Sequence, residues 1–459
     1  MCMRIELPND VNLIIEKIET SGHEAFVVGG AIRDSLLGIE PSDWDIVTSA
    51  KPEEIKQIFS SYKTFDISFG TVGLIVNKEK YEISTYKLNS GYNAKKASYA
   101  GCLLGDILHR DLTINSMAYN PKLGLIDYVN GLQDLYNKKI RFVGNPLERI
   151  GEDPLRTLRA LRFELALQGF KLDDAVRDFC KEQFKKQYNS ISIERIRAEI
   201  NKVLFIKEFT DSSKLSDFFI LMTDTVMPEF KPAIGFDQKS MYHQYDVFEH
   251  CIQTVIKTEP ILGLRWAALL HDIGKPDTMT EDLIGYRHFY GHPEVSEQLA
   301  DKILTRLKFS KRFKREVLDL VKHHDDCRKG INKTKLRSFI SKHDERFINI
   351  WIKLKWADIY SHADIDRLVM YQTDLVNTVQ IILTDGTGIS LRELKVNGRD
   401  LCEELGINDG PIIGDLLNRL LHECHGLPKN NNREWLLAEA KRRYKYLKNL
   451  SNHTRRYKD

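Results

Sequence analysis

The spacing of apolar residues changes near residue 148, and this change limits the fold more than any other feature. Before it, short runs rich in β-branched and aromatic residues alternate with helical stretches. These runs cover residues 25–28, 73–76 and 81–86. After it, apolar residues recur at helical spacing and strand-like alternation almost disappears. The sequence therefore predicts an α+β domain with a mixed sheet, followed by all-α domains.

The length of 459 residues exceeds what one hydrophobic core usually serves, so we expect roughly two to four domains. Two groups of helix-breaking residues mark candidate boundaries within the helical part. One is formed by Pro228, Pro232 and Gly235, and the other by the glycine-containing segment 385–388.

Composition excludes several classes of protein. No apolar run reaches the length of a membrane span, and the first residues lack a secretory signal. The seven cysteines include no CxxC pair, which argues against a zinc ribbon or a disulfide framework. We expect a soluble, cytoplasmic protein with no membrane partner, and the sequence indicates no particular protein partner.

A glycine turn followed by paired aspartates is the most informative motif. A strand ends in a tight turn at Gly29 and Gly30, and a helix begins there whose free N–H groups suit a triphosphate. Asp43 and Asp45 fall on one face of the next strand, where two carboxylates repel each other unless cations neutralise them. Mg²⁺ is the natural partner of such a pair in phosphoryl transfer. Glu82, on a later strand, is a candidate third carboxylate.

The order of these motifs resembles a known family. GGxxRD followed by DxD is similar to the head of the polymerase-beta superfamily, specifically its class II branch of CCA-adding enzymes (tRNA nucleotidyltransferases) and bacterial poly(A) polymerases. Residues 109–115 are similar to that branch's RRDxTxN element, with His109 in place of the first arginine, and residues 152–163 match EDxxRxxRAxRF. The resemblance implies that Asp43 and Asp45 hold the catalytic metal ions.

The resemblance also implies where the nucleotide binds. Arg110, Asp111 and Asn115 are expected to contact its ribose and phosphates. The full set of expected nucleotide-binding residues is Gly29, Gly30, Arg33, Arg110, Asp111, Asn115, Asp153, Arg156, Arg159 and Arg162.

Asp153 and Arg156 lie three residues apart, so we expect them on one helical face, where together they can read a base. A carboxylate accepts from the exocyclic amine of cytosine or adenine while a guanidinium donates to the adjacent ring nitrogen; guanine and uracil present the opposite polarity. CTP and ATP are therefore the expected substrates. The alternative for an isolated pair is an ordinary surface ion pair. Arg159 and Arg162 extend the face and are expected to hold phosphates or neighbouring helices.

A second constellation combines histidines and aspartates in the helical part. The candidate ligands are His250, His271, Asp272 and Asp358, with His292 and His323 as further candidates. Imidazoles mixed with carboxylates suit a divalent metal in a hydrolytic site. The pattern resembles the HD phosphohydrolase superfamily, which implies phosphatase or cyclic phosphodiesterase activity with an unidentified divalent metal. Many HD domains have lost activity, so both outcomes stay open.

The expected organisation follows from these resemblances. It consists of a nucleotidyltransferase head (1–147), a helical neck that reads the base (148–228), an HD domain (229–375) and a helical tail that binds tRNA (376–459). The tail is similar to the family's tRNA-binding segment, and its basic run at 441–446, interleaved with tyrosines, suits RNA.

The expected function is untemplated addition of C and A residues to the tRNA 3′ end from CTP and ATP, with Mg²⁺ in the head. Residues 88–98 depart from the family's DGRxP loop, which helps the switch from C to A addition. A poly(A) polymerase or a partial CC- or A-adding enzyme is therefore the first alternative. An HD-domain phosphohydrolase acting on RNA ends or nucleotides is the second.

Overall fold

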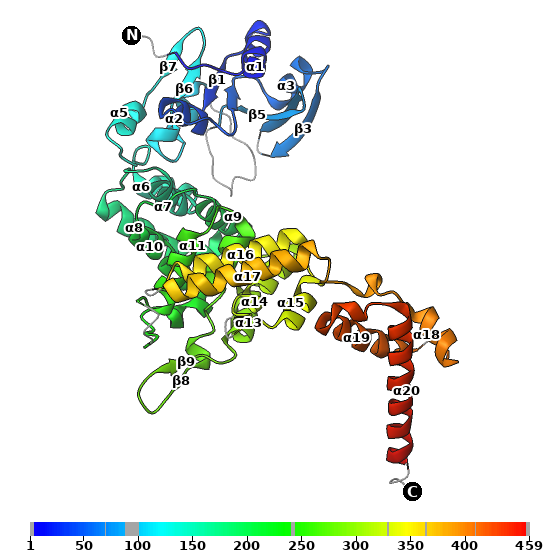
Figure 1. Ribbon diagram of the computed structural model, residues 1–459. Coiled ribbons are helices and arrows are strands. Elements are labelled where there is room, and N and C mark those ends of the chain that lie inside the picture. Colours follow the sequence, from blue (N-terminus) through cyan, green and yellow to red (C-terminus); the bar gives the residue numbers. More distant parts are fainter. Residues whose placement is uncertain are drawn as a thin grey trace. The chain divides into compact units, whose positions relative to one another are not determined.

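A mixed β-sheet forms the centre of the N-terminal part (Figure 1). The computed structural model describes residues 4–68, 70–87, 101–239, 244–327, 330–362, 365–408 and 410–455. Within these, seven strands pair in the order β3-β4-β5-β2-β1-β6-β7, with β2 and β5 parallel and the other neighbours antiparallel. The strands are β1 (Ala25–Val28), β2 (Asp45–Thr48), β3 (Lys63–Ser68), β4 (Thr71–Val76), β5 (Glu79–Thr85), β6 (Ala118–Asn120) and β7 (Gly124–Ile126).

The sheet is central because its middle strands are apolar on both faces. All four residues of β1 are buried, as are Ile46 and Val47 of β2. The helices of this domain are α1 (Asn9–Thr20), α2 (Gly30–Leu36), α3 (Pro52–Ile58), α4 (Leu103–Leu108) and α5 (Gly131–Tyr136), with the 3₁₀ turn η1 (Thr113–Asn115). Residues 88–98, which depart in sequence from the family's DGRxP loop, lie outside the described residues.

Helices follow the sheet, as the apolar spacing predicted. They are α6 (Pro146–Glu152), α7 (Arg156–Ala166), α8 (Asp174–Gln187), η2 (Tyr188–Ser190), α9 (Ile193–Leu204) and α10 (Ser212–Thr223). Leu158, Leu161 and Leu165 all lie on the buried face of α7. The sheet and these helices make one unit, residues 1–228, and residues 229–459 make a second.

The second unit is almost entirely helical. Its elements are η3 (Pro228–Ala233), α11 (Val247–Lys257), α12 (Leu262–Leu270), η4 (Pro276–Thr278), α13 (His292–Arg306), α14 (Lys311–His323), α15 (Lys333–Ile340), α16 (Glu345–Ile359), α17 (Asp366–Thr384), η5 (Leu391–Glu393), α18 (Gly398–Leu405), α19 (Pro411–Gly426), η6 (Pro428–Asn430) and α20 (Arg433–Arg455). The α+β head followed by helical domains is thus confirmed. One short hairpin, β8 (Thr280–Glu281) with β9 (Arg287–His288), was not predicted.

That hairpin is set by its turn rather than by alternating strands. The Asp282 carboxylate accepts hydrogen bonds from the backbone N–H groups of Ile284 and Tyr286, and Gly285 has a φ of +88°. Two-residue strands carry no readable alternation, so the sequence pattern could not reveal them.

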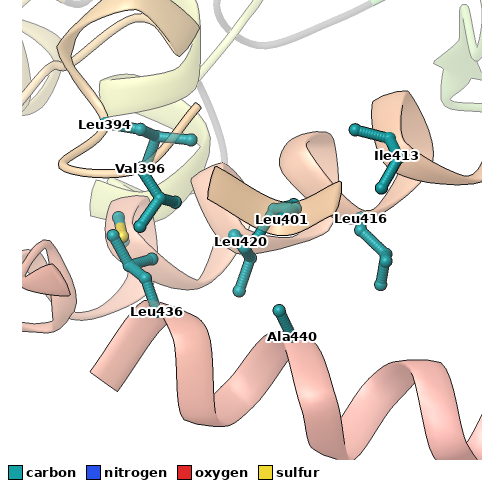
Figure 2. Close-up of a cluster of buried hydrophobic side chains, with 9 residues drawn as sticks. Leu394, Val396, Leu401, Ile413, Leu416, Leu420, Leu436 and Ala440 are labelled. Carbon is teal, nitrogen blue, oxygen red and sulfur yellow. The ribbon is translucent and has the colours of Figure 1, made fainter. Parts of the chain in front are cut away.

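The C-terminal helices share a core of their own (Figure 2). Leu416 and Leu420 of α19 point toward Leu436 and Ala440 of α20, and Leu401 of α18 joins them. None of the helices in the described residues is long and apolar enough to cross a membrane.

Candidate functional site

The three predicted carboxylates of the head meet at one end of the sheet. Asp45 opens β2, opposite Val28 of β1 on one side and Glu82 of β5 on the other. Asp43 lies two residues before β2 and is exposed, so it is in the preceding loop and not on a face of that strand as expected. The parallel pairing of β2 with β5 brings Glu82 beside an aspartate that lies far from it in sequence.

The electrostatics of this end of the sheet favour a cation. The pKa of Asp45 is raised, first because surrounding protein removes water from its carboxylate and then because Asp43 adds negative charge. Arg110 opposes the shift, and Glu82 adds to it. Crowded carboxylates of this kind are the oxygen donors that hard divalent cations take.

Gly29 keeps the space above the carboxylates open. It has a φ of +81°, and a Cβ there would lie 3.8 Å from Asp45 Oδ2 and 3.6 Å from Arg110 Nη1. Any other residue would be strained at this positive φ, and its side chain would occupy part of the space between the Arg110 guanidinium and the Asp45 carboxylate. The turn predicted at Gly29 and Gly30 therefore adjoins Asp45 directly.

Lys87 is a basic neighbour that sequence reasoning missed. Its Nζ donates to Thr71 Oγ1 at 3.0 Å, and its backbone N–H donates to Asp106, the residue that also pairs with Arg110. Burial lowers the pKa of Lys87, while the charge of Asp106 opposes that shift. Lys87 follows the end of β5, so period-two alternation gave no signal for it.

Four of the predicted nucleotide-binding residues hydrogen-bond to one another in two pairs. Arg33 donates to Asn115 Oδ1 at 2.5 Å and pairs with Asp34. Arg159 Nε donates to Asp111 Oδ2 at 2.6 Å. Burial disfavours the charged form of Asp111, but Arg159 and the Leu112 N–H outweigh it and lower its pKa to about 2.

We expect Asp111→Asn to be less stable than the natural chain at pH 7, with a difference that shrinks as pH falls from 5 to 2. Since the folded-state pKa of Asp111 lies below 3.8, its ionised form stabilises the fold above the unfolded pKa, and this contribution is lost as pH falls through about 2. The contribution is about 2 kcal/mol. Urea unfolding of both chains at several pH values measures it. A difference that stays constant between pH 7 and 3 would contradict the assignment.

The expectation that Asp153 and Arg156 share a helical face is wrong. Helix α6 ends at Glu152, Asp153 has extended backbone angles, and α7 begins at Arg156. The cause is Pro154, because a residue that precedes proline is forced out of the helical region. Both side chains are nevertheless buried at this junction.

The structure gives each of the two residues its own support. Arg195 of α9 donates two hydrogen bonds to the Asp153 carboxylate, at 3.1 and 2.6 Å. Arg156 donates to Glu152 Oε2 at 2.6 Å and to the carbonyl oxygen of His109 at 2.6 Å. The neck therefore touches the loop that carries Arg110.

Two residues of α9 were missed by sequence reasoning. Glu199 accepts from Arg162 at 2.6 Å and lies 3.9 Å from Arg159, while Arg195 holds Asp153. Arg162 is thus tied to a neighbouring helix, one of the two roles expected for it. The ERxxxE spacing of residues 194–199 was visible, but nothing in it specifies these distant partners.

A second site lies in the helical unit, where buried histidines and aspartates converge. Helices α11, α13 and α16 supply three of them, and the segments that follow α12, α14 and α16 supply the others. The cluster contains His250, His271, Asp272, His292, His324, Asp358 and His362, all less than 9% exposed.

Asp272 is at the centre of the cluster. Its Oδ2 lies 3.4 Å from His250 Nε2 and 3.3 Å from His271 Nε2. Its Oδ1 lies 3.2 Å from His292 Nε2 and 3.4 Å from His324 Nε2. Asp358 joins the group around Asp272 Oδ2, because its Oδ1 lies 3.0 Å from His250 Nε2.

The histidine ring orientations fit a divalent metal. The Nδ1 atoms of His271, His292 and His324 each meet a backbone carbonyl oxygen, at 2.9, 2.8 and 2.7 Å, which places the ring proton on Nδ1. Their Nε2 lone pairs then face inward, and Nε2 atoms lie only 3.3 Å apart in one pair and 3.1 Å apart in another. A cation between such donors removes the repulsion.

Asp272 and His271 shift each other's protonation. Burial opposes protonation of His271, but the charge of Asp272 outweighs it and raises the pKa of His271 well above its ordinary value. Burial likewise opposes ionisation of Asp272, but His271 and Lys275 outweigh it and lower the pKa of Asp272. Asp272 is therefore a carboxylate, ready to hold a cation.

Of the predicted ligands, His323 needs correction. Its Nδ1 lies 2.6 Å from Asp326 Oδ2, outside the cluster, and the adjacent His324 takes its place. Successive residues of a helix point about 100° apart, so the two histidines at the end of α14 face different sides. His362 was missed as well, although it lies four residues after Asp358, a spacing that places both on one side of a helix.

Comparison with known proteins identifies the two domains that carry these clusters. The model of the Poly A polymerase head domain matches residues 25–141, and that of the HD domain matches residues 247–361. The structure of the Bacillus stearothermophilus CCA-adding enzyme in complex with CTP has the same fold, with a TM-score of 0.69 at 23% identity over 95% of this chain and 98% of that one. The Thermotoga maritima CCA-adding enzyme complexed with tRNA_CCA also shares it, with a TM-score of 0.55 at 20% identity over 95% and 96%.

A sequence relative settles the family. The CCA-adding enzyme of Ligilactobacillus salivarius is 32% identical over 443 residues, which cover 94% of this chain and 95% of that protein. A chain this similar over almost its whole length belongs to the CCA-adding enzymes, a family of tRNA nucleotidyltransferases.

Proposed function

We propose that this chain extends the tRNA 3′ end with C and A residues from CTP and ATP, and that Asp43, Asp45 and Glu82 form its catalytic centre. The observation that carries the proposal is the meeting of these carboxylates beside the Gly29 turn. Family membership and the similar folds determined with CTP and with tRNA_CCA support the substrates.

The carboxylate centre fits Mg²⁺, which we propose as the metal of the head. When bound, Mg²⁺ lowers the pKa of an attacking hydroxyl and neutralises phosphate charge. The chain's own contribution is to hold Asp45 and Glu82 in register, to leave room at Gly29 for a triphosphate, and to set Arg110 beside it.

Base selection is the part of the proposal that the neck supports. The Asp153 carboxylate is fixed by Arg195, so both of its oxygens are held as acceptors with a defined direction. Such a group favours the exocyclic amines of cytosine and adenine. The donor partner is Arg156, whose guanidinium is oriented by Glu152 and the His109 carbonyl.

We expect Asp153→Asn to relax the choice of nucleotide. An amide both donates and accepts, so it can pair with the carbonyl of uracil or guanine, and incorporation of UTP relative to CTP should rise about tenfold. Labelled CTP, ATP, UTP and GTP, supplied one at a time to tRNA lacking its terminal CCA, measure this. Asp178→Asn, an exposed aspartate on α8, is the matched control. Unchanged selectivity in Asp153→Asn would exclude Asp153 as the base reader, and no transfer by the natural chain would exclude the function.

We further propose the domain limits 1–147, 148–228, 229–375 and 376–459 for head, neck, HD domain and tail. The tail is proposed to bind the tRNA body, and its basic run lies on α20, where Arg443 pairs with Glu423 and Glu439. We place the reaction in the cytoplasm, where its tRNA and nucleotides are found.

A second candidate function is metal-dependent phosphate ester hydrolysis at the HD cluster. The inward-facing Nε2 atoms around Asp272 favour it, because they form two adjoining ligand groups, one with His250 and His271 and the other with His292 and His324. A bound divalent metal supplies the activated water for hydrolysis.

A further inference from the structure

A cavity of about 780 Å³ opens beside the HD cluster. The ligand His292 and the neighbouring Lys275 form one side of it, and Arg287, Lys322 and Lys335 add positive charge. Three acidic residues, Glu294, Asp325 and Asp326, also line this cavity. Its volume lies toward the upper end of the range for small-molecule sites, so it is larger than one nucleotide requires.

A second cavity of about 230 Å³ adjoins the first. The two linings share Asp326, Lys335 and Phe339, and the two cavities together are called the groove below. Two lysines and three histidines line the second cavity. Its lining includes Lys335, Lys342, His323, His343 and His422. Its one acidic lining residue, Asp326, already accepts from His323 Nδ1 at 2.6 Å.

The far end of the groove lies against the tail. His422 belongs to α19, and α15 packs on that helix, where Arg337 Nη1 donates to the His425 carbonyl oxygen at 2.8 Å. Two aromatic side chains with accessible surface line the groove: Tyr290 lines the first cavity, and Phe339 lines both. Basic groups interleaved with aromatic faces are the pattern by which proteins bind single-stranded nucleic acid.

We propose that this groove holds the single-stranded 3′ end of an RNA, with its terminal phosphate at the HD cluster and the preceding backbone phosphates at Lys335 and Lys342. The inference rests on the phosphohydrolase function proposed above and names its substrate as an oligonucleotide end rather than a free nucleotide. A mononucleotide fills only the first cavity and does not reach Lys342, which lines only the second. In the hydrolysis, the oxygen of water bonds to phosphorus, the P–O bond to the ribose breaks, and the ribose oxygen takes the proton.

Lys342→Glu tests the groove, because Lys342 is exposed and lines only the second cavity. Phosphate release is measured from a tetraribonucleotide 3′-phosphate and from cytidine 3′-phosphate. We expect the KM for the tetranucleotide to rise about tenfold while that for the mononucleotide stays within about twofold. Lys311→Glu, an exposed lysine on α14 outside both cavities, should change neither. Equal effects on both substrates, or none on the tetranucleotide, would overturn the proposal.

A binding measurement separates this proposal from the phosphohydrolase function. Fluorescence anisotropy of a 5′-labelled tetranucleotide, taken in EDTA at several salt concentrations, needs no turnover. Lys342→Ala should lower the slope of log affinity against log salt by about 0.7, the value for one phosphate contact on a single strand. If no substrate releases phosphate but this slope falls, the phosphohydrolase function fails and the RNA groove stands. A slope unchanged by Lys342→Ala would overturn the groove.

Discussion

Asp45→Asn should lower the rate of nucleotide transfer by about 10³-fold without loss of stability. Asp45 pairs in register with Glu82 and lies beside the Gly29 turn, so no other carboxylate can take its position. The amide keeps the shape of the side chain but removes one of three crowded negative charges. Relief of that repulsion should leave the temperature of unfolding unchanged or slightly raised.

Incorporation of labelled CTP into tRNA lacking CCA, together with thermal unfolding, tests this expectation. Asp66→Asn provides the matched control, because Asp66 lies on β3 of the same sheet and makes only an exposed pair with Lys56. Its transfer rate should stay within about twofold of the natural value, since exposed pairs contribute little. Equal losses in the two variants would remove Asp45 from the catalytic centre.

Asp272→Asn should empty the HD cluster of metal and leave nucleotide transfer intact. The two oxygens of Asp272 serve different ligand groups, so one substitution weakens both. His292→Ala touches one group only and should lose about half of the bound metal, as expected for two adjoining sites. Metal content after dialysis, measured by mass spectrometry, gives both results.

His323→Ala is the control for this experiment, because His323 contacts Asp326 rather than the cluster. It should retain the full metal content. Metal retained by Asp272→Asn would contradict the ligand assignment. Transfer activity lost together with metal in Asp272→Asn would contradict the independence of the two sites.

The sequence predicted the head well because its signals are local. The strand at residues 25–28, the turn at Gly29 and the strand that opens at Asp45 each follow from neighbouring residues, and they lie where they were expected. The failed helical face of Asp153 was also readable, since Pro154 stands in the sequence and forces the break.

Other parts of the sites could not be predicted from spacing. The choice between His323 and His324 depends on which face of α14 packs inward. Both histidines lie at the end of this helix, and helix ends are the hardest part of a helix to predict from sequence. The ion pair between Arg195 and Asp153 joins α9 to the junction of α6 and α7, and the two residues are 42 positions apart in the sequence. Lys87 reaches the carboxylate centre only because β5 pairs in parallel with β2.

The most direct test of the central claim is the sequence of the product. Purified natural chain is incubated with Mg²⁺, CTP, ATP and a tRNA that ends just before its CCA, and the 3′ ends are sequenced. The account predicts that extension stops after CCA and that a tRNA already ending in CC receives a single A. Long adenosine tails on varied RNAs, or no extension at all, would contradict it.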